Sequence, residues 1–264
     1  MVEARMIALF AGLLGLAVGS FLNVVVYRVP RGESVVNPPS HCPRCDSLVR
    51  ARHNVPVVGW VLLRGRCADC RLPISVRYPL VELATGLLFA AIALRFDTVA
   101  VLPAYLWFAG TGVALALIDL DVRRLPNAIV VPSYPVLLAL LAGAAAWEHH
   151  WWALARAVIG GAVLFGFYLL VVVAYPAGMG WGDVKLSGLV GGVLAFLSWQ
   201  TFVIGAFAAF LLGAVVGVAV MLAGRGGRKT ALPFGPFMIG GVLLAVFAAA
   251  PVASWYGTLL SPSY

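Results

Sequence analysis

Four cysteines form two pairs with the same short spacing. Cys42 and Cys45 make the first C-x2-C pair, and Cys67 and Cys70 make the second after a gap of 21 residues. Each pair can present two thiolates to one ion, and four thiolates complete a closed tetrahedral zinc site that leaves no position open for catalysis. The spacing therefore predicts a structural zinc site. Iron in the same site and two disulfides are the alternatives.

Acidic side chains at the ends of long apolar segments are the second feature that could do chemistry. Asp119 and Asp121 end one such segment, and Asp183 opens another after Gly180 and Gly182. Two carboxylates brought close cannot both ionise easily, so they share a proton and can activate water as base and acid together. The glycines could let an extended peptide lie beside Asp183 without meeting a Cβ atom. The alternative for each aspartate is a helix cap or a solvated residue.

Apolar segments long enough to cross a membrane must position these residues. Of the 264 residues, 62% are hydrophobic and 11% are charged, against about 25% charged in a soluble domain. This composition excludes soluble globular and disordered proteins, and the unbroken apolar runs disfavour a transmembrane barrel. We predict an all-α polytopic membrane protein with about eight crossings. The predicted crossings are 6–27, 79–95, 99–118, 128–146, 154–174, 184–197, 201–223 and 236–255.

The sixth and seventh crossings are nearly continuous in sequence. Forty apolar residues would make a helix of about 60 Å, twice the thickness of the hydrocarbon core. The chain must therefore turn, and the polar residues 198–201 are the place to do so. We expect the sixth segment to be short and packed inside the bundle.

Positive charge is distributed unequally among the predicted loops. Fifteen of the 18 Lys and Arg residues lie in or beside the loops 28–78, 119–127, 175–183 and 224–235. The positive-inside rule places these loops in the cytoplasm and both termini outside. The cysteine loop and the three aspartates then reach the same face. The net charge of +8 indicates topology and contact with anionic lipid headgroups rather than nucleic-acid binding.

The sequence resembles the type IV prepilin peptidases, a family of GxGD intramembrane aspartic proteases, along nearly its whole length. Besides the two cysteine pairs, the matching motifs lie at 19–23, 27–30, 63–67, 77–82, 119–127, 178–186 and 233–237. A minor departure is Val58-Gly59-Trp60, where Leu-Ser-Trp is usual. The resemblance implies that the catalytic residues are Asp119 and Asp183, with Asp121 non-catalytic. The residues that support the two motifs are Gly180, Gly182, Lys185, Pro126 and Asn127.

The resemblance also implies a reaction. The family cleaves the leaders of prepilins and pseudopilins after a glycine, at the cytoplasmic face of the bacterial inner membrane. Many members then methylate the new N-terminus with S-adenosylmethionine, and these carry a cysteine loop like the one found here. We expect a first transmembrane helix at 1–27, a cytoplasmic zinc-binding domain at 28–78 and a seven-helix peptidase domain at 79–264. No residues that bind S-adenosylmethionine are indicated.

Other functions remain as alternatives to this interpretation. A peptidase without methyltransferase activity is the nearest alternative. A transporter that uses two carboxylates as a proton or cation relay predicts pH-dependent flux, but it explains neither the GxGD motif nor the cysteine loop. A zinc-binding membrane adaptor that recruits a partner predicts that Asp119→Asn is harmless.

Overall fold

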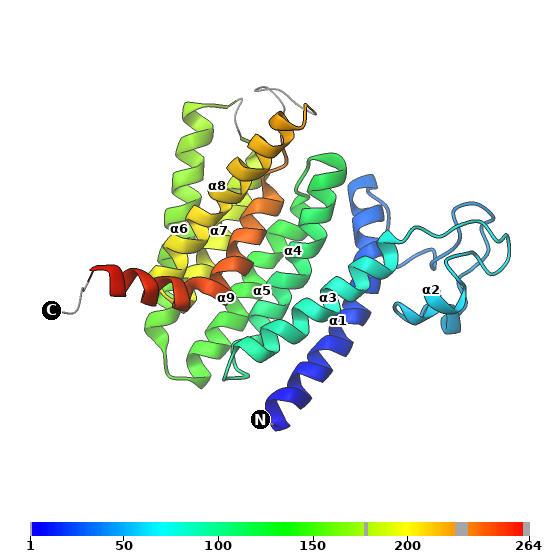
Figure 1. Ribbon diagram of the computed structural model, residues 1–264, viewed down its shortest axis with the longest axis horizontal. Coiled ribbons are helices and arrows are strands. Elements are labelled where there is room, and N and C mark those ends of the chain that lie inside the picture. Colours follow the sequence, from blue (N-terminus) through cyan, green and yellow to red (C-terminus); the bar gives the residue numbers. More distant parts are fainter. Residues whose placement is uncertain (1, 177–178, 225–231, 261–264) are drawn as a thin grey trace. The chain divides into compact units, whose positions relative to one another are not determined.

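The computed structural model describes residues 2–176, 179–224 and 232–260. Over these residues the structure is helical, with two isolated antiparallel bridges in the loop that follows the first helix (Figure 1). The chain divides into two compact units, Met1–Ile118 and Asp119–Tyr264. Gly178 and the basic residues Arg225, Arg228 and Lys229, which entered the motif and charge arguments, lie outside the described residues.

Two long helices pack side by side in the first unit. They are α1 (Val2–Arg28) and α3 (Arg77–Arg95), and α4 (Leu102–Val122) follows them (Figure 1). A Cβ atom on Gly15 would lie 2.8 Å from the Cα atom of Gly86, and one on Gly19 would lie 2.7 Å from the Cα atom of Glu82. The small residues of α1 therefore allow close packing against α3 within one chain.

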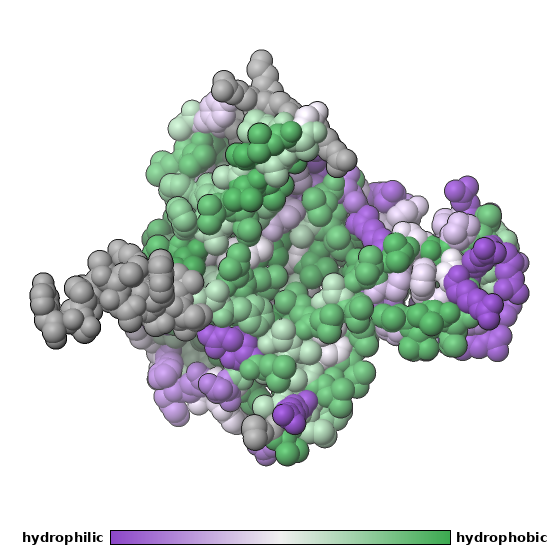
Figure 2. Space-filling model, viewed as in Figure 1, coloured by the Kyte–Doolittle hydropathy of each residue, from purple (hydrophilic) through white to green (hydrophobic). Residues whose placement is uncertain are grey.

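The loop between α1 and α3 contains only short helical turns. These are η1 (Val29–Arg31), η2 (Ala51–His53) and α2 (Val58–Leu62). Figure 2 shows hydrophilic residues gathered over this part of the chain, whereas hydrophobic residues dominate the visible surface of the long helices. The Trp60 indole N–H donates a hydrogen bond to the carbonyl oxygen of Ile74 at 3.1 Å. The Val57 N–H donates to the carboxylate of Glu82 at 2.7 Å, which ties the loop to α3.

Helix α7 is the central helix of the second unit. The unit contains the last turn of α4 and the helices α5 (Asn127–Trp147), α6 (Trp151–Ala174), α7 (Trp181–Leu197), α8 (Trp199–Leu222) and α9 (Gly235–Leu260). Helix α7 packs against the other four, and 11 of its 17 residues are buried. This confirms the prediction of a short sixth segment inside the bundle. A backbone break at Ser198, whose hydroxyl accepts the Thr201 N–H at 3.0 Å, separates α7 from α8.

The C-terminal end of α7 is capped by a side chain from another helix. Arg156 of α6 donates hydrogen bonds to the carbonyl oxygens of Ala195, Phe196 and Leu197. The last carbonyl groups of a helix have no partner within it and carry partial negative charge. The guanidinium group therefore satisfies and neutralises this end of α7.

The apolar helices agree with the predicted membrane segments. Among the described residues, six helices are long and apolar enough to cross a membrane, namely α1, α3, α4, α5, α6 and α8. Helix α7 and the Gly235–Ala249 part of α9 are shorter apolar helices. Each of the eight predicted segments thus overlaps one apolar helix, although 99–118 begins before α4 and 201–223 ends after α8. The all-α, multi-pass membrane fold is confirmed.

Candidate functional site

Asp119 lies on the last turn of α4 and faces the start of α9. Its side chain is buried, and its Oδ2 atom accepts a hydrogen bond from the Gly235 N–H at 3.0 Å. Gly235 is the first residue of α9, so the carboxylate sits where unpaired N–H groups and the helix dipole favour negative charge. A Cβ atom on Gly235 would lie 2.8 Å from Asp119 Oδ2. A side chain at this position would require the Asp119 carboxylate to shift.

Asp183 lies in the first turn of α7 and is half-buried. Its Oδ2 atom accepts the Gly180 N–H at 3.2 Å, so the side chain does cap its own helix. Both aspartates belong to the second unit, and Leu125 packs beside Gly182, the residue before Asp183, and beside Gly235, the hydrogen-bond donor to Asp119. Asp121, two residues beyond Asp119, is exposed. The structure thus brings Asp119 and Asp183 together.

Leu125 packs against the backbone beside both aspartates. A Cβ atom on Gly182 would lie 2.9 Å from the Leu125 Cβ atom, and one on Gly235 would lie 3.3 Å from Leu125 Cδ2. Leu125 occupies the space beside Gly182, so this glycine serves close packing of the segment after α4 against the start of α7.

Helix α5, which begins at the Pro126-Asn127 motif, is linked to α7 by two side-chain hydrogen bonds. Pro126 precedes α5, and the Oδ1 atom of Asn127 accepts a hydrogen bond from the Lys185 ammonium group at 3.0 Å. The Tyr134 hydroxyl donates to the Lys185 carbonyl oxygen at 2.5 Å. Lys185 therefore joins α5 to the first turns of α7. Between described residues, no ion pair links Lys185 to Asp183.

A buried tyrosine completes the surroundings of Asp183. Tyr168 of α6 is 1% exposed and interacts electrostatically with Asp183. Its ring centroid lies 5.8 Å from that of Phe210 and 6.2 Å from that of Phe234, the residue before Gly235. The sequence analysis missed Tyr168 because an aromatic residue within an apolar helix has no spacing that distinguishes it from ordinary packing.

The arrangement has the groups that acid–base hydrolysis requires. One carboxylate is buried and the other half-buried, and each accepts one backbone N–H. In a site of low dielectric constant the repulsion between two such charges favours one shared proton. A pair in this state can take a proton from water with one member and donate a proton with the other.

The structure also brings the four cysteine sulfur atoms together, all within 4.8 Å of one another. The Sγ atoms of Cys42 and Cys70 are 3.9 Å apart, and those of Cys45 and Cys67 are 4.0 Å apart. A tetrahedral zinc ion with Zn–S bonds of about 2.3 Å requires S···S separations of about 3.8 Å, whereas a disulfide requires about 2.0 Å. The cluster therefore fits a metal ion and not disulfides.

The two cysteine pairs have the same backbone geometry. The Cys42 N–H donates to the Ser47 carbonyl at 2.9 Å, and the Cys67 N–H donates to the Leu72 carbonyl at 2.8 Å. Hydrogen bonds with the side chain and backbone of Ser47 lower the pKa of Cys45 to about 6. A thiolate is the metal-binding form of cysteine. Each turn thus directs two sulfur atoms toward one point.

Comparisons with known proteins match both the part of the chain that contains the cysteine loop and the part that contains the two aspartates. The family model "Bacterial Peptidase A24 N-terminal domain" matches residues 13–96, and the model "Type IV leader peptidase family" matches residues 105–218. No solved structure matched the chain significantly.

Three similar proteins carry the name prepilin leader peptidase/N-methyltransferase. The protein of Stutzerimonas stutzeri is 34% identical over 97% of this chain and 93% of its own length. That of Pseudomonas putida is 37% identical over 86% of each chain. That of Myxococcus xanthus is 43% identical over 84% of this chain, which spans 66% of the relative. The chain belongs to the type IV leader peptidase family.

Proposed function

We propose that this enzyme removes the leader of type IV prepilins or pseudopilins and then methylates the new N-terminus. The peptidase part is supported by the packing of Leu125 against the residues that flank or hold Asp119 and Asp183, two partly buried aspartates far apart in sequence. The methyltransferase part rests on relatives named for both activities over most of the chain. It is also supported by the match of the N-terminal family model to residues 13–96.

The two carboxyl groups divide the work of peptide hydrolysis. One, ionised, removes a proton from water as the water oxygen attacks the carbonyl carbon of the leader glycine. The other donates its proton to the carbonyl oxygen. As the tetrahedral intermediate collapses, the C–N bond breaks and the amine leaves with a proton returned by the pair. The hydrogen bonds from the Gly235 and Gly180 N–H groups hold the two carboxylates in place.

The metal site has a structural role in this proposal. Cys42, Cys45, Cys67 and Cys70 would hold a zinc ion, and four thiolates leave no coordination position for substrate. The loop has few buried apolar residues, so metal binding replaces a hydrophobic core in stabilising it. S-adenosylmethionine would supply the methyl group that the new amine accepts.

Orientation and domain limits complete the proposal. The enzyme is a multi-pass protein that would lie in the bacterial inner membrane with residues 28–78 and the aspartates facing the cytoplasm. Residues 1–27 would form the first transmembrane helix, and residues 79–264 would carry the peptidase. Prepilins or pseudopilins and the surrounding lipids are the partners.

A cleavage assay with matched variants tests the peptidase assignment. The purified protein in detergent is incubated with a synthetic prepilin, with and without S-adenosylmethionine, and the products are weighed by mass spectrometry. Asp119→Asn and Asp183→Asn should each lower the cleavage rate by on the order of a thousandfold or more, because the pair acts as a unit. Asp121→Asn should leave the rate near that of the wild type.

The outcomes separate the alternatives. Full cleavage by either Asn variant would refute the dyad. A product that never gains a methyl group with S-adenosylmethionine present would indicate a peptidase without the second activity. An uncut prepilin together with pH-dependent ion flux in liposomes would indicate a transporter.

A further inference from the structure

A buried arginine in the first unit forms no ion pair with any residue that the structure describes. Arg28, at the end of α1, is only 7% exposed, and its Nη1 atom donates to the Ser34 carbonyl oxygen at 3.0 Å. No carboxylate of a described residue forms an ion pair with it. The dipole at the C-terminus of α1 offsets part of this charge. A buried charge otherwise requires a paired anion, and here a ligand could supply one.

Arg28 lines a cavity of about 420 Å³, which is within the usual range of small-molecule sites. One wall is the face of α1 that does not pack on α3, with residues 17, 20, 21, 24 and 28 at helical spacing. The other walls are residues 35–40 after η1 and residues 54 and 56 before α2. All of these residues belong to the first unit.

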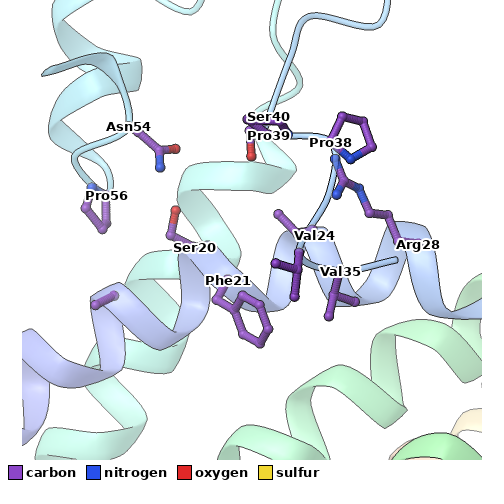
Figure 3. A pocket seen from close by; sticks show the side chains of 12 residues that line it. Ser20, Phe21, Val24, Arg28, Val35, Pro38, Pro39, Ser40, Asn54 and Pro56 are labelled. Atoms are coloured by element: carbon purple, nitrogen blue, oxygen red, sulfur yellow. The ribbon is translucent and has the colours of Figure 1, made fainter. Parts of the chain in front are cut away.

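The cavity offers different chemistry at its two ends. In Figure 3 the Arg28 side chain extends from α1 toward Pro38, with Val24 and Val35 beside it. Ser20 and Asn54 lie farther along the cavity, where the hydroxyl and the amide can form hydrogen bonds, and Phe21 supplies an aromatic face. The lining thus combines a cation for an anionic group, apolar walls and polar groups that fix orientation, as in sites for amphipathic small molecules.

The wall formed before α2 is held in place by Glu82. This residue is 8% exposed, and its carboxylate accepts the Val57 N–H at 2.7 Å. Val57 follows Pro56 and lies three residues after Asn54, so the hydrogen bond anchors the segment that closes the cavity. Glu82 is therefore a positioning residue for this site.

We propose that this cavity binds S-adenosylmethionine, with the carboxylate of its methionine part paired with Arg28. A guanidinium group matches a carboxylate with two parallel hydrogen bonds. The Phe21 face and the polar pair Ser20 and Asn54 are suited to the adenosine part. The inference rests on the proposed methyl transfer, since that activity requires a site for a small molecule with one carboxylate and one nucleoside. A phospholipid phosphate is the other anion that Arg28 could bind.

Direct binding distinguishes these possibilities without relying on activity. Equilibrium dialysis with radiolabelled S-adenosylmethionine is performed on the purified full-length protein and on Arg28→Gln, Ser20→Trp and Arg31→Gln variants. Arg28→Gln removes the charge, and Ser20→Trp fills the cavity while leaving the charge in place. Arg31→Gln is the matched control, because Arg31 is exposed and stacks on Tyr27 at 3.9 Å outside the cavity lining.

We expect Arg28→Gln to weaken binding by about tenfold or more, the loss expected for a charge-assisted hydrogen-bonded pair. Ser20→Trp should abolish measurable binding, and Arg31→Gln should bind like the wild type. Thermal unfolding without ligand shows which variants are folded. If Arg28→Gln is not folded, Ser20→Trp tests whether S-adenosylmethionine occupies the cavity.

Three results would overturn the proposal in different ways. Wild-type binding that is unchanged in folded Arg28→Gln or Ser20→Trp would place the methyl donor elsewhere and leave the proposed function intact. A wild-type protein that does not bind S-adenosylmethionine would also refute the proposed methyl transfer. If Arg28→Gln instead loses only co-purifying phosphatidylglycerol, measured by mass spectrometry, the cavity is a lipid site.

Discussion

Single atoms decide how the two aspartates are held. Gly235 contributes one N–H to Asp119, and the space where its Cβ would stand is already taken by the carboxylate oxygen. Gly180 contributes the corresponding N–H to Asp183, and the space where the Cβ of Gly182 would stand is taken by Leu125. Gly182 and Gly235 are therefore required by contacts within the enzyme. Neither position can accept a side chain without moving a residue of the site.

Substitution of Gly235 tests this view of the dyad. In Gly235→Ala the new Cβ atom would lie 2.8 Å from Asp119 Oδ2, so the carboxylate must shift and its hydrogen bond must lengthen. We expect kcat/KM for prepilin cleavage to fall by on the order of 100-fold, the effect of misplacing a catalytic group by about 1 Å. Gly166→Ala is the control, because no atom lies within 4 Å of its Cβ position. Equal rates for both variants would contradict the tight fit.

Helix α7 has 17 residues, fewer than the about 20 of a typical membrane-spanning helix, and contacts with other elements stabilise it. Its first turn is capped by Asp183 itself, and its last carbonyl groups are capped by Arg156 from α6. Glycines at the crossing with α6 bring the backbones together, since a Cβ atom on Gly191 would lie 2.9 Å from Leu164 Cβ. The helix that carries Asp183 is thus fixed at both ends and along one side.

Removal of the α7 cap should destabilise the second unit. Arg156→Met keeps an apolar stem but leaves the carbonyl groups of Ala195, Phe196 and Leu197 without their donor. The expected loss is at least about 3 kcal/mol of unfolding free energy, since three carbonyl groups lose their donor and a hydrogen bond to a charged group contributes about 1.5–3 kcal/mol. Denaturant unfolding in detergent measures it. Arg5→Met, at an exposed position near the start of α1, should unfold like the wild type, and no difference between the two variants would refute the cap.

The cysteine loop is the other element whose stability can be tested alone. Elemental analysis should find one zinc ion per chain, and a Cys45→Ser/Cys70→Ser double variant should lose it. Without metal the loop lacks a core, so limited proteolysis should cut within residues 28–76 at least about tenfold faster. Asp69→Asn is the control, because it removes only the exposed ion pair with Arg50, which contributes little. Iron in place of zinc, or unchanged proteolysis, would contradict this prediction.

At the scale of the whole molecule, orientation depends on which helices cross the bilayer. Within the described ranges, six helices are long and apolar enough to do so, whereas α7 and the Gly235–Ala249 part of α9 are shorter. The predicted common face of the cysteine loop, Asp119 and Asp183 requires α5 and α6 to form one pair of crossings and α3 and α4 another. Both termini lie outside only if α7, α8 and α9 add three further crossings.

Reporter fusions test this topology directly. Alkaline phosphatase should be inactive when fused after Arg124 or Gly182 and active when fused after Glu148, Ser198 or the last residue, because it folds only outside the cytoplasm. Positive charge in the loops expected to face the cytoplasm is the physical cause of this orientation. Activity after Arg124 would invert the orientation, and inactivity after Ser198 would show that α7 does not cross.

The sequence by itself determined where the apolar helices lie, the turn at Ser198 and the pairing of cysteines in one loop. These features are local, because an apolar run must leave water wherever it occurs and a C-x2-C turn positions its own two thiols. The catalytic assignments and the orientation remain predictions. Only the tertiary structure placed Gly235 on Asp119, Leu125 beside Gly182, Arg156 at the end of α7 and Arg28 in a cavity. Such contacts join residues from separate helices, and no periodicity within one helix specifies which face of another helix will meet it.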